Sequence, residues 1–197
     1  MASGAGEGGR RVRIARIEHA GAVAEIYAPY VRDTVISFEY DAPGEAEIAG
    51  RMAKVQTRLP WLILEEDARL MGYAYASPHR ERAAYQWSVD VGIYVRQGAQ
   101  RSGIGRALYA RLLAALTAQG YHRAYGAITL PNAASVGLHE ACGFRHIGSY
   151  PEVGFKFGAW HGVGWWGLDL GTSFAPEPPI PFSPAIFARA EEGLRCD

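Results

Sequence analysis

The sequence predicts a single mixed α/β domain in which helices cover a central sheet. Its 197 residues, 49% of them apolar and 20% charged, suffice to bury one hydrophobic core. Short runs with strand-like alternation are interspersed with segments of helical periodicity. One such run, at residues 89–95, passes through a glycine-containing turn into a long amphipathic segment that begins near Ile104. Elements that alternate in this way favour a sheet with helices packed on it.

The first half of the chain predicts two helices and an antiparallel hairpin. Apolar residues recur at helical spacing between 20 and 32, as Val23, Ile26 and Tyr27 show. Residues 34–40 alternate like a strand, but they lie between two helices, so a substrate-lining loop is an equal alternative. The other predicted elements are a strand at 12–17, a helix at 45–58, and hairpin strands at 61–64 and 70–75.

The second half predicts two helices with clear end signals. The long helix that begins near Ile104 ends at Gly120. A shorter helix lies between Asn132, a good N-cap, and Gly143, which suits the position after a helix end. The predicted strands of this half lie at 89–95, 124–128, 144–150 and 164–170.

Three segments are expected along the chain: a flexible N-terminus at 1–11, the folded domain at 12–171, and a proline-rich C-terminal arm at 172–197. Prolines crowd positions 176–184 and argue against regular structure in the arm. Its apolar side chains are available to dock on this domain or on a partner. They include Phe182, Ile186 and Phe187.

Composition excludes several function classes. Twenty basic and twenty acidic residues cancel, so no general attraction to nucleic acid or to an anionic membrane is expected. No apolar run approaches the roughly 20 residues that cross a bilayer, and the first residues lack an apolar signal-peptide core. Two cysteines, Cys142 and Cys196, are too few for a disulfide framework, which indicates the reducing cytoplasm. We expect no metal site.

The turn at residues 100–106 is the first candidate binding site. A strand, a glycine turn and a helix start point free backbone N–H groups and the positive helix end at an anion. Gly103 and Gly105 would let a pyrophosphate approach the main chain, and Arg101 and Arg106 could add charged hydrogen bonds. The pattern is neither G-x-G-x-x-G nor a P-loop. A turn whose glycines serve geometry alone is the alternative.

Two motifs together carry a resemblance to a known family. Gln-x-x-Gly-x-Gly opens the helix after the 89–95 strand, and Asn-x-x-Ser-x-x-Leu-His-Glu-x-x-Gly-Phe fills residues 132–144. This pair resembles the GNAT superfamily of acetyl-CoA-dependent N-acetyltransferases, and most closely its phosphinothricin N-acetyltransferase family. His139 stands where many superfamily members carry tyrosine. The resemblance runs from about Arg13 to Leu170. It implies a mostly antiparallel sheet, flanked by helices, whose central strands splay apart.

The resemblance implies acetyl-CoA as co-substrate and a set of residues that bind it. The phosphates would meet the N–H groups of the glycine turn, and the 93–95 strand would pair with the pantetheine amides. Asn132 would reach the pantetheine arm in addition to capping its helix. The implied residues are Ile93, Tyr94, Val95, Arg101, Ser102, Gly103, Ile104, Gly105, Arg106 and Asn132.

The resemblance also implies catalytic and substrate-binding residues. Asp90 would accept the proton of the amine, directly or through a water, although the family usually places glutamate there. His139 would orient the substrate or return a proton to the thiolate; a structural histidine is the alternative. An N–H freed by a bulge near Gly92 would stabilise the oxyanion. Arg80, Arg82 and Tyr85 would face the substrate; a solvated surface loop is the alternative.

The implied function is acetylation of the α-amino group of phosphinothricin or a similar small amino acid. Methionine sulfone or sulfoximine is the alternative substrate, and a non-catalytic acyl-CoA sensor is the alternative from another class. Asp90 in place of glutamate and the proline-rich tail are the two departures from the family pattern. The expected partners are the small-molecule amino acid and a second copy of the chain in a homodimer.

Overall fold

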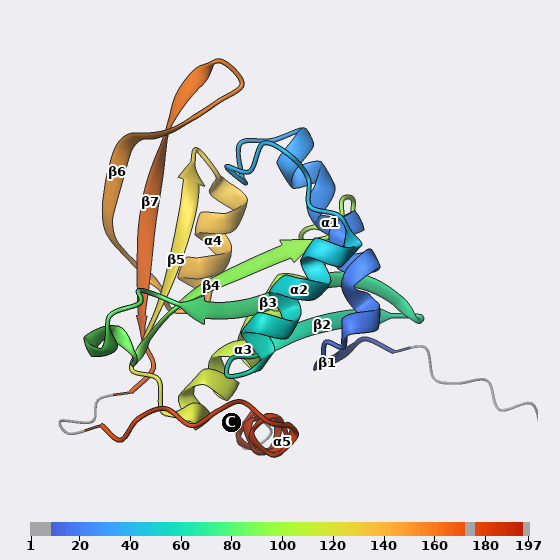
Figure 1. Cartoon of the computed structure of the whole chain (residues 1–197), viewed down its shortest axis with the longest axis vertical. Coiled ribbons are helices and arrows are strands. Elements are labelled where there is room, and N and C mark those ends of the chain that lie inside the picture. The colour runs from blue at the N-terminus through green and yellow to red at the C-terminus, as the bar shows by residue number, and fades with distance from the viewer. Residues whose placement is uncertain (1–8, 172–175, 195–197) are drawn as a thin grey trace, which may run out of the picture.

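The computed structural model describes residues 9–171 and 176–194 and shows a twisted sheet with helices on both faces (Figure 1). Five α-helices and seven strands lie in the described part. The strands are β1 (Arg11–Ile14), β2 (Trp61–Glu66), β3 (Arg69–Pro78), β4 (Ser88–Val95), β5 (Arg123–Leu130), β6 (Arg145–Lys156) and β7 (Ala159–Asp169). The helices are α1 (Ala20–Arg32), α2 (Glu45–Gln56), α3 (Ile104–Gln119), α4 (Ala133–Ala141) and α5 (Pro184–Gly193), with 3-10 turns η1 (Ile17–His19) and η2 (Ala83–Tyr85).

The strands are ordered β1-β2-β3-β4-β5-β7-β6. Every neighbouring pair is antiparallel except β4 and β5, which run parallel. Their shared ladder covers only Ser88–Asp90 against Arg123–Tyr125. Beyond Asp90 the two strands diverge, as Figure 1 shows. The mostly antiparallel sheet and its central splay are therefore as predicted.

The two faces of the sheet carry different cores. Val89 and Val91 of β4 point toward α3 and join an aliphatic cluster with Leu108 and Leu112. The alternate residues face α1 and α2, because successive side chains of a strand point to opposite faces. On that face Trp61 and Tyr73 belong to the second cluster, with Tyr75 and Tyr94 packed against it. Asp90 lies on the same aromatic-rich face, opposite Ser77 of β3.

Most predicted elements are found, with longer strands at the C-terminal end. The helix predicted at 20–32 has those bounds, and Gly120 ends α3 with a φ of +91°. The predicted closing strands at 144–150 and 164–170 are parts of a longer β6–β7 hairpin. The first strand ends at Ile14, earlier than predicted, because η1 follows at Ile17–His19. The sharp Phe157–Gly158 turn, both with positive φ, joins the two long strands.

Residues 34–40 form a loop, so the strand interpretation of this segment is wrong. Its polar groups bind other partners: the Ser37 hydroxyl accepts a hydrogen bond from the Glu39 N–H at 3.1 Å. The Lys156 ammonium donates to the carbonyls of Thr34 and Ser37, at 3.0 and 2.7 Å, and to that of Val31 at the end of α1. Carbonyls bound in this way do not join a strand ladder, whatever the alternation of side chains.

The C-terminal arm contains a helix, contrary to the expectation that its prolines exclude regular structure. The prolines precede the helix instead of interrupting it: Pro184 occupies its first turn, where a missing N–H costs nothing. The Ser183 side chain caps the helix by accepting from the Ile186 N–H at 3.3 Å. Ile186 is buried, and Phe182 and Phe187 pack on the core under α3, so the arm docks on its own domain.

Among residues 9–171 and 176–194, no helix is both long and apolar enough to cross a membrane. Residues 1–8 of the predicted N-terminal segment, and Cys196, lie outside the described residues.

Candidate active site

The glycine turn forms an anion cradle at the start of α3. Gly103 is the N-cap residue and has a φ of +85°, a left-handed conformation that favours glycine. The N–H groups of Ile104, Gly105 and Arg106 belong to the first turn, where no helical carbonyl can accept them. The turn is braced from within, since the Ser102 hydroxyl donates to the Ala99 carbonyl at 2.6 Å. The exposed side chain of Arg106 adds positive charge beside these amides.

Gly105 brings α4 against the start of α3. A Cβ atom at this position would lie 2.9 Å from Leu138 Cδ2, closer than real contacts allow. A side chain at position 105 would have to displace the end of the Leu138 side chain of α4. Asn132 caps α4, with its Oδ1 accepting from the Ser135 N–H at 3.1 Å. Its side-chain NH2 is not used in that bond and can donate to an extended ligand between the helices.

The free edge of β4 offers main-chain groups next to this cradle. Ile93, Tyr94 and Val95 lie past the end of the ladder with β5, so within residues 9–171 and 176–194 their edge toward β5 has no strand partner. An extended ligand with amide groups can pair with such an edge as an added strand. Tyr94 contributes its main chain only, because its ring is buried against Tyr27, at 4.8 Å between centroids, and Tyr73.

The predicted bulge near Gly92 is absent. The ladder between β3 and β4 continues without a register shift from Gly72–Val95 to Pro78–Val89. Glycine is favoured at position 92 by packing instead, because a Cβ there would lie 2.7 Å from the ring of Tyr75. The main-chain groups available on β4 come from the splay of β4 and β5 instead.

Asp90 lies at the apex of the splay, paired with a histidine that the sequence analysis did not single out. Asp90 Oδ1 lies 2.6 Å from His79 Nδ1, and both side chains are half-buried. Burial raises the pKa of Asp90, while the hydrogen bond and charge of His79 act in the opposite direction. The His79 ring stacks near Tyr125, at 4.6 Å between centroids, and Tyr125 is the β5 partner of Asp90.

A hollow of about 280 Å³ opens beside His79. Arg80 lies on its wall with the guanidinium carbon 5.9 Å from the centre of the Trp165 ring. The Trp165 Nε1–H is buried and finds no acceptor among the described residues. The guanidinium on this wall suits an anionic ligand group. The other lining residues are Tyr125, Ile147, Gly148 and Tyr150.

The other two predicted substrate residues lie at the edge of this region. Tyr85 is 43% exposed, and its ring is 5.9 Å from that of His79. Arg82 is exposed just before η2, and among the described residues no ion pair involves it. The structure therefore brings Arg80 and Tyr85 to His79 and leaves Arg82 outside.

His139 is 3% exposed and lies in the core between α3 and β5. Its Nε2 lies 2.9 Å from the Tyr109 hydroxyl, and its Nδ1 lies 2.8 Å from the Ser135 carbonyl. The ring contacts β5 so closely that a Cβ on Gly126 would lie 2.5 Å from Nε2. Both ring nitrogens are occupied, which is typical of a structural histidine. The predicted catalytic role of His139 stays a prediction.

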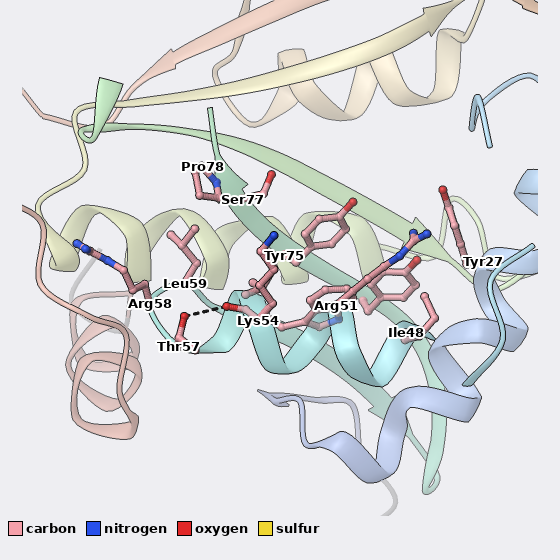
Figure 2. Close-up of a pocket in the computed structure, with 13 residues that line it drawn as sticks. Tyr27, Ile48, Arg51, Lys54, Thr57, Arg58, Leu59, Tyr75, Ser77 and Pro78 are labelled. Atoms are coloured by element: carbon pink, nitrogen blue, oxygen red, sulfur yellow. Dashed lines mark hydrogen bonds between the residues drawn. The ribbon is translucent and has the colours of Figure 1, made fainter. Parts of the chain in front are cut away.

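A second cavity, of about 470 Å³, lies between α2 and the aromatic strands β2 and β3. Figure 2 shows Arg51 from α2 and Tyr75 from β3 reaching into it. Arg51 binds both carboxylate oxygens of Glu39, at 2.7 and 2.8 Å, and this pairing lowers the pKa of Glu39. Tyr27 donates to the same carboxylate at 2.7 Å. Glu39 is thus held charged, and both of its carboxylate oxygens are bonded.

Comparison with known proteins decides the family. The model of the acetyltransferase (GNAT) family matches residues 22–144, more than half of the chain. The chain belongs to the GNAT acetyltransferases. It is therefore an N-acetyltransferase of a family that uses acetyl-CoA, and the cradle, the free β4 edge and Asn132 fit that co-substrate.

Within the GNAT family, the chain is similar to acetyltransferases that are named for amino-acid substrates. The chain is 36% identical, over 88% of its length and 93% of the relative, to a phosphinothricin N-acetyltransferase of Streptomyces viridochromogenes. It is 30% identical, over 84% of its length and 98% of the relative, to an L-methionine sulfoximine/L-methionine sulfone acetyltransferase of Salmonella typhimurium. A phosphinothricin acetyltransferase from Sinorhizobium meliloti, solved with acetyl-CoA, superposes with a TM-score of 0.82 at 32% identity, covering 89% of this chain and 96% of that one.

Proposed function

We propose that this GNAT enzyme acetylates the α-amino group of a small amino acid, with phosphinothricin or a close analogue as the best candidate. The observation that carries the proposal is the splay of β4 and β5 at Asp90. It lies between the anion cradle of α3 and the hollow with Arg80. Acetyl-CoA and amine can therefore meet at one point of the sheet, and relatives named phosphinothricin N-acetyltransferase support the substrate class.

The reaction requires a neutral amine and a place for its proton. At pH 7 an α-amino group is mostly protonated and therefore not nucleophilic. The paired side chains of Asp90 and His79, with Oδ1 and Nδ1 2.6 Å apart, lie where this proton can be accepted. Acetyl-CoA supplies the activated acetyl group, and the β4 main chain and the α3 amides position it.

The substrate would bind by the oxygens of its side chain. Arg80 can bind a phosphinate, sulfone or carboxylate oxygen, while the amine turns toward the His79–Asp90 pair. A tetrahedral phosphorus or sulfur presents oxygens in a similar arrangement. Methionine sulfone and sulfoximine are therefore the second candidates, as the Salmonella relative suggests.

A panel assay tests the proposal. Thiol release from acetyl-CoA should depend on adding phosphinothricin or methionine sulfone and should be weak with simple amines. No release with any amino acid, alongside measurable binding of CoA, would favour the non-catalytic sensor instead.

The position of Arg80 gives a sharper test of the substrate site. Arg80→Met should raise KM for phosphinothricin about tenfold or more and change KM for a simple amine little, because it removes a charge-assisted bond to the anion. Arg82→Met, the comparison variant on the same loop, tests the second arginine predicted from the sequence. An equal rise in KM for both substrate types in Arg80→Met would contradict the proposed contact between Arg80 and the anionic group.

A homodimer is the proposed assembly. The β6–β7 hairpin forms the edge of the sheet and carries large exposed apolar side chains. They are Ile147, Tyr150, Val153, Phe155, Phe157 and Trp160, each 47–62% exposed. Light scattering of the wild type should give twice the mass of one chain, and Phe157→Asp should give the mass of a single chain. A monomeric wild type would contradict the dimer. The reducing cytoplasm, in which the Cys142 thiol stays free, is the proposed compartment.

A further inference from the structure

We propose that His79, held in place by Asp90, is the group that takes the proton from the attacking amine. In this arrangement Asp90 is a positioning residue and His79 is the catalytic residue. The inference rests on the proposed acetyl transfer and names the residue that performs its proton step.

The His79–Asp90 contact has the geometry of a carboxylate that orients an imidazole. The 2.6 Å separation of Nδ1 and Oδ1 fits a short hydrogen bond in which Nδ1–H donates to the carboxylate. A neutral imidazole with its proton fixed on Nδ1 carries a lone pair on Nε2, which makes Nε2 the basic atom. Among the described residues, none forms a hydrogen bond with Nε2 of His79.

The position of the ring matches the meeting point of the two substrates. The backbone N–H of His79 donates to the Ser88 carbonyl at 3.3 Å, which fixes His79 beside the start of β4. From there the ring reaches over Tyr125, the last β5 residue paired with β4, and lines the hollow with Arg80. Asp90 does not line that hollow, so an amine bound there meets His79 first.

The short side chain of Asp90 explains why a histidine is needed. An aspartate side chain reaches one methylene less far than a glutamate would. The imidazole of His79 extends the reach of the carboxylate by the width of a ring. Two other candidate bases are engaged elsewhere: Glu39 is bound by Arg51, and both nitrogens of His139 are occupied.

The charges around His79 favour proton acceptance and release. Asp90 is the acidic group in contact with the ring, and it stabilises the imidazolium that forms. Arg80 follows in sequence and opposes that charge, which helps the proton to leave. The remaining titratable groups that face the ring from packed elements are the hydroxyls of Tyr85 and Tyr125.

The proton step balances without a further reactant. The amine nitrogen bonds to the thioester carbonyl carbon as the carbon–sulfur bond breaks, and the N–H proton passes to His79 Nε2. The imidazolium then gives this proton to the thiolate of CoA, directly or through water. The products are the N-acetyl amino acid and CoA thiol, and His79 returns to its neutral form.

Kinetics of three variants test the assignment. His79→Asn and His79→Ala should lower kcat about 100-fold or more with little change in CoA affinity. Added imidazole should partly restore His79→Ala in a saturable manner, which no structural role would produce. Asp90→Asn should lower kcat less than His79→Asn. His146→Asn, on β6 with its ring bonded to Ser149 at 2.9 Å, is the control and should keep wild-type rates.

Histidine side-chain NMR gives a readout independent of turnover. In the wild type, His79 should carry its proton on Nδ1 at neutral pH, and Asp90→Asn should shift the ring toward a mixture of tautomers. Wild-type kcat in His79→Asn, with the acid limb of the kcat/KM profile intact, would overturn the inference and return the role to Asp90. Absence of acetylation in the wild type with every amine would overturn the proposed function, and this inference with it.

Discussion

Two histidines of this enzyme show how surroundings decide what the same side chain does. His79 has one ring nitrogen on Asp90 and lies at the wall of a hollow. His139 has both nitrogens bonded and is packed between Tyr109 and Phe144. The sequence motif drew attention to His139, while His79 lies in a loop-like stretch without periodicity. Only the β3–β4 pairing brings His79 to Asp90, and the sequence alone does not give that register.

At the residue scale, His139 should make stability depend on pH. Burial lowers its pKa, so between that lowered value and the ordinary 6.5 the unfolded chain binds more protons than the folded one. The stability from His139 is therefore present above pH 6.5 and is lost as pH falls from there through the folded pKa. Denaturant unfolding at pH 8 and pH 5.5 measures this, and His139→Asn should show a smaller loss on acidification.

The same variant separates structure from catalysis. If His139→Asn is folded at pH 8 and retains most of the wild-type turnover rate, its role is structural. A folded variant that turns over about 100-fold more slowly than the wild type would support the catalytic role predicted from the family resemblance.

At the element scale, the acetyl-CoA site depends on how closely α3 and α4 approach. Gly105→Ala would place a Cβ 2.9 Å from Leu138 Cδ2 and displace that side chain at the start of α3. We expect CoA binding, measured by calorimetry, to weaken about tenfold, and thermal stability to fall. Gly137→Ala is the matched control, because nothing lies within 4 Å of its Cβ position on exposed α4. This variant should bind CoA with wild-type affinity, and its free energy of unfolding should rise by about 0.5–1 kcal/mol, because alanine favours a helix more than glycine does.

Lys156 connects three elements through its ammonium group. It is 2% exposed and donates to carbonyls of Val31, Thr34 and Ser37, joining the end of α1 and the 34–40 loop to β6. Lys156→Met should leave these carbonyls without a donor, and each buried unsatisfied group lowers the free energy of unfolding by about 1–3 kcal/mol. Unfolding in urea should show a loss of at least about 2 kcal/mol. Lys54→Met, at an exposed position, should stay within about 0.5 kcal/mol of wild type.

Sequence periodicity predicted the elements whose own residues decide their conformation. The helix at 20–32 and the capped α4 have their predicted limits because apolar spacing and caps act locally. The 34–40 loop and the length of the β6–β7 hairpin depend on distant partners, such as Lys156 and the Tyr40 hydroxyl bonded to the Phe155 carbonyl at 2.6 Å. The anion cradle was predictable from its motif, whereas the His79–Asp90 pair needed the fold.

At the scale of the whole molecule, the two faces of the sheet have separate tasks. The face under α1 and α2 carries Asp90, the hollow and the aromatic strands, and the α3 face carries the aliphatic core. The C-terminal segment extends that core: Ile186 and Ala190 are buried, and α5 packs beside α3 (Figure 1). Polar contacts fix it, including Glu191 with Arg111 at 3.1 Å.

Removing the apolar contact of α5 should therefore weaken the entire domain. Ile186 is 7% exposed, so Ile186→Ala should lower the free energy of unfolding by about 2–3 kcal/mol and Tm by about 4–12 °C for a chain of this size. Ile180→Ala is the control, because Ile180 is 47% exposed on the same segment while its N–H donates to the Gln119 carbonyl. Calorimetry should show one shifted transition in Ile186→Ala. An unchanged Tm would mean that α5 folds against the domain without stabilising it.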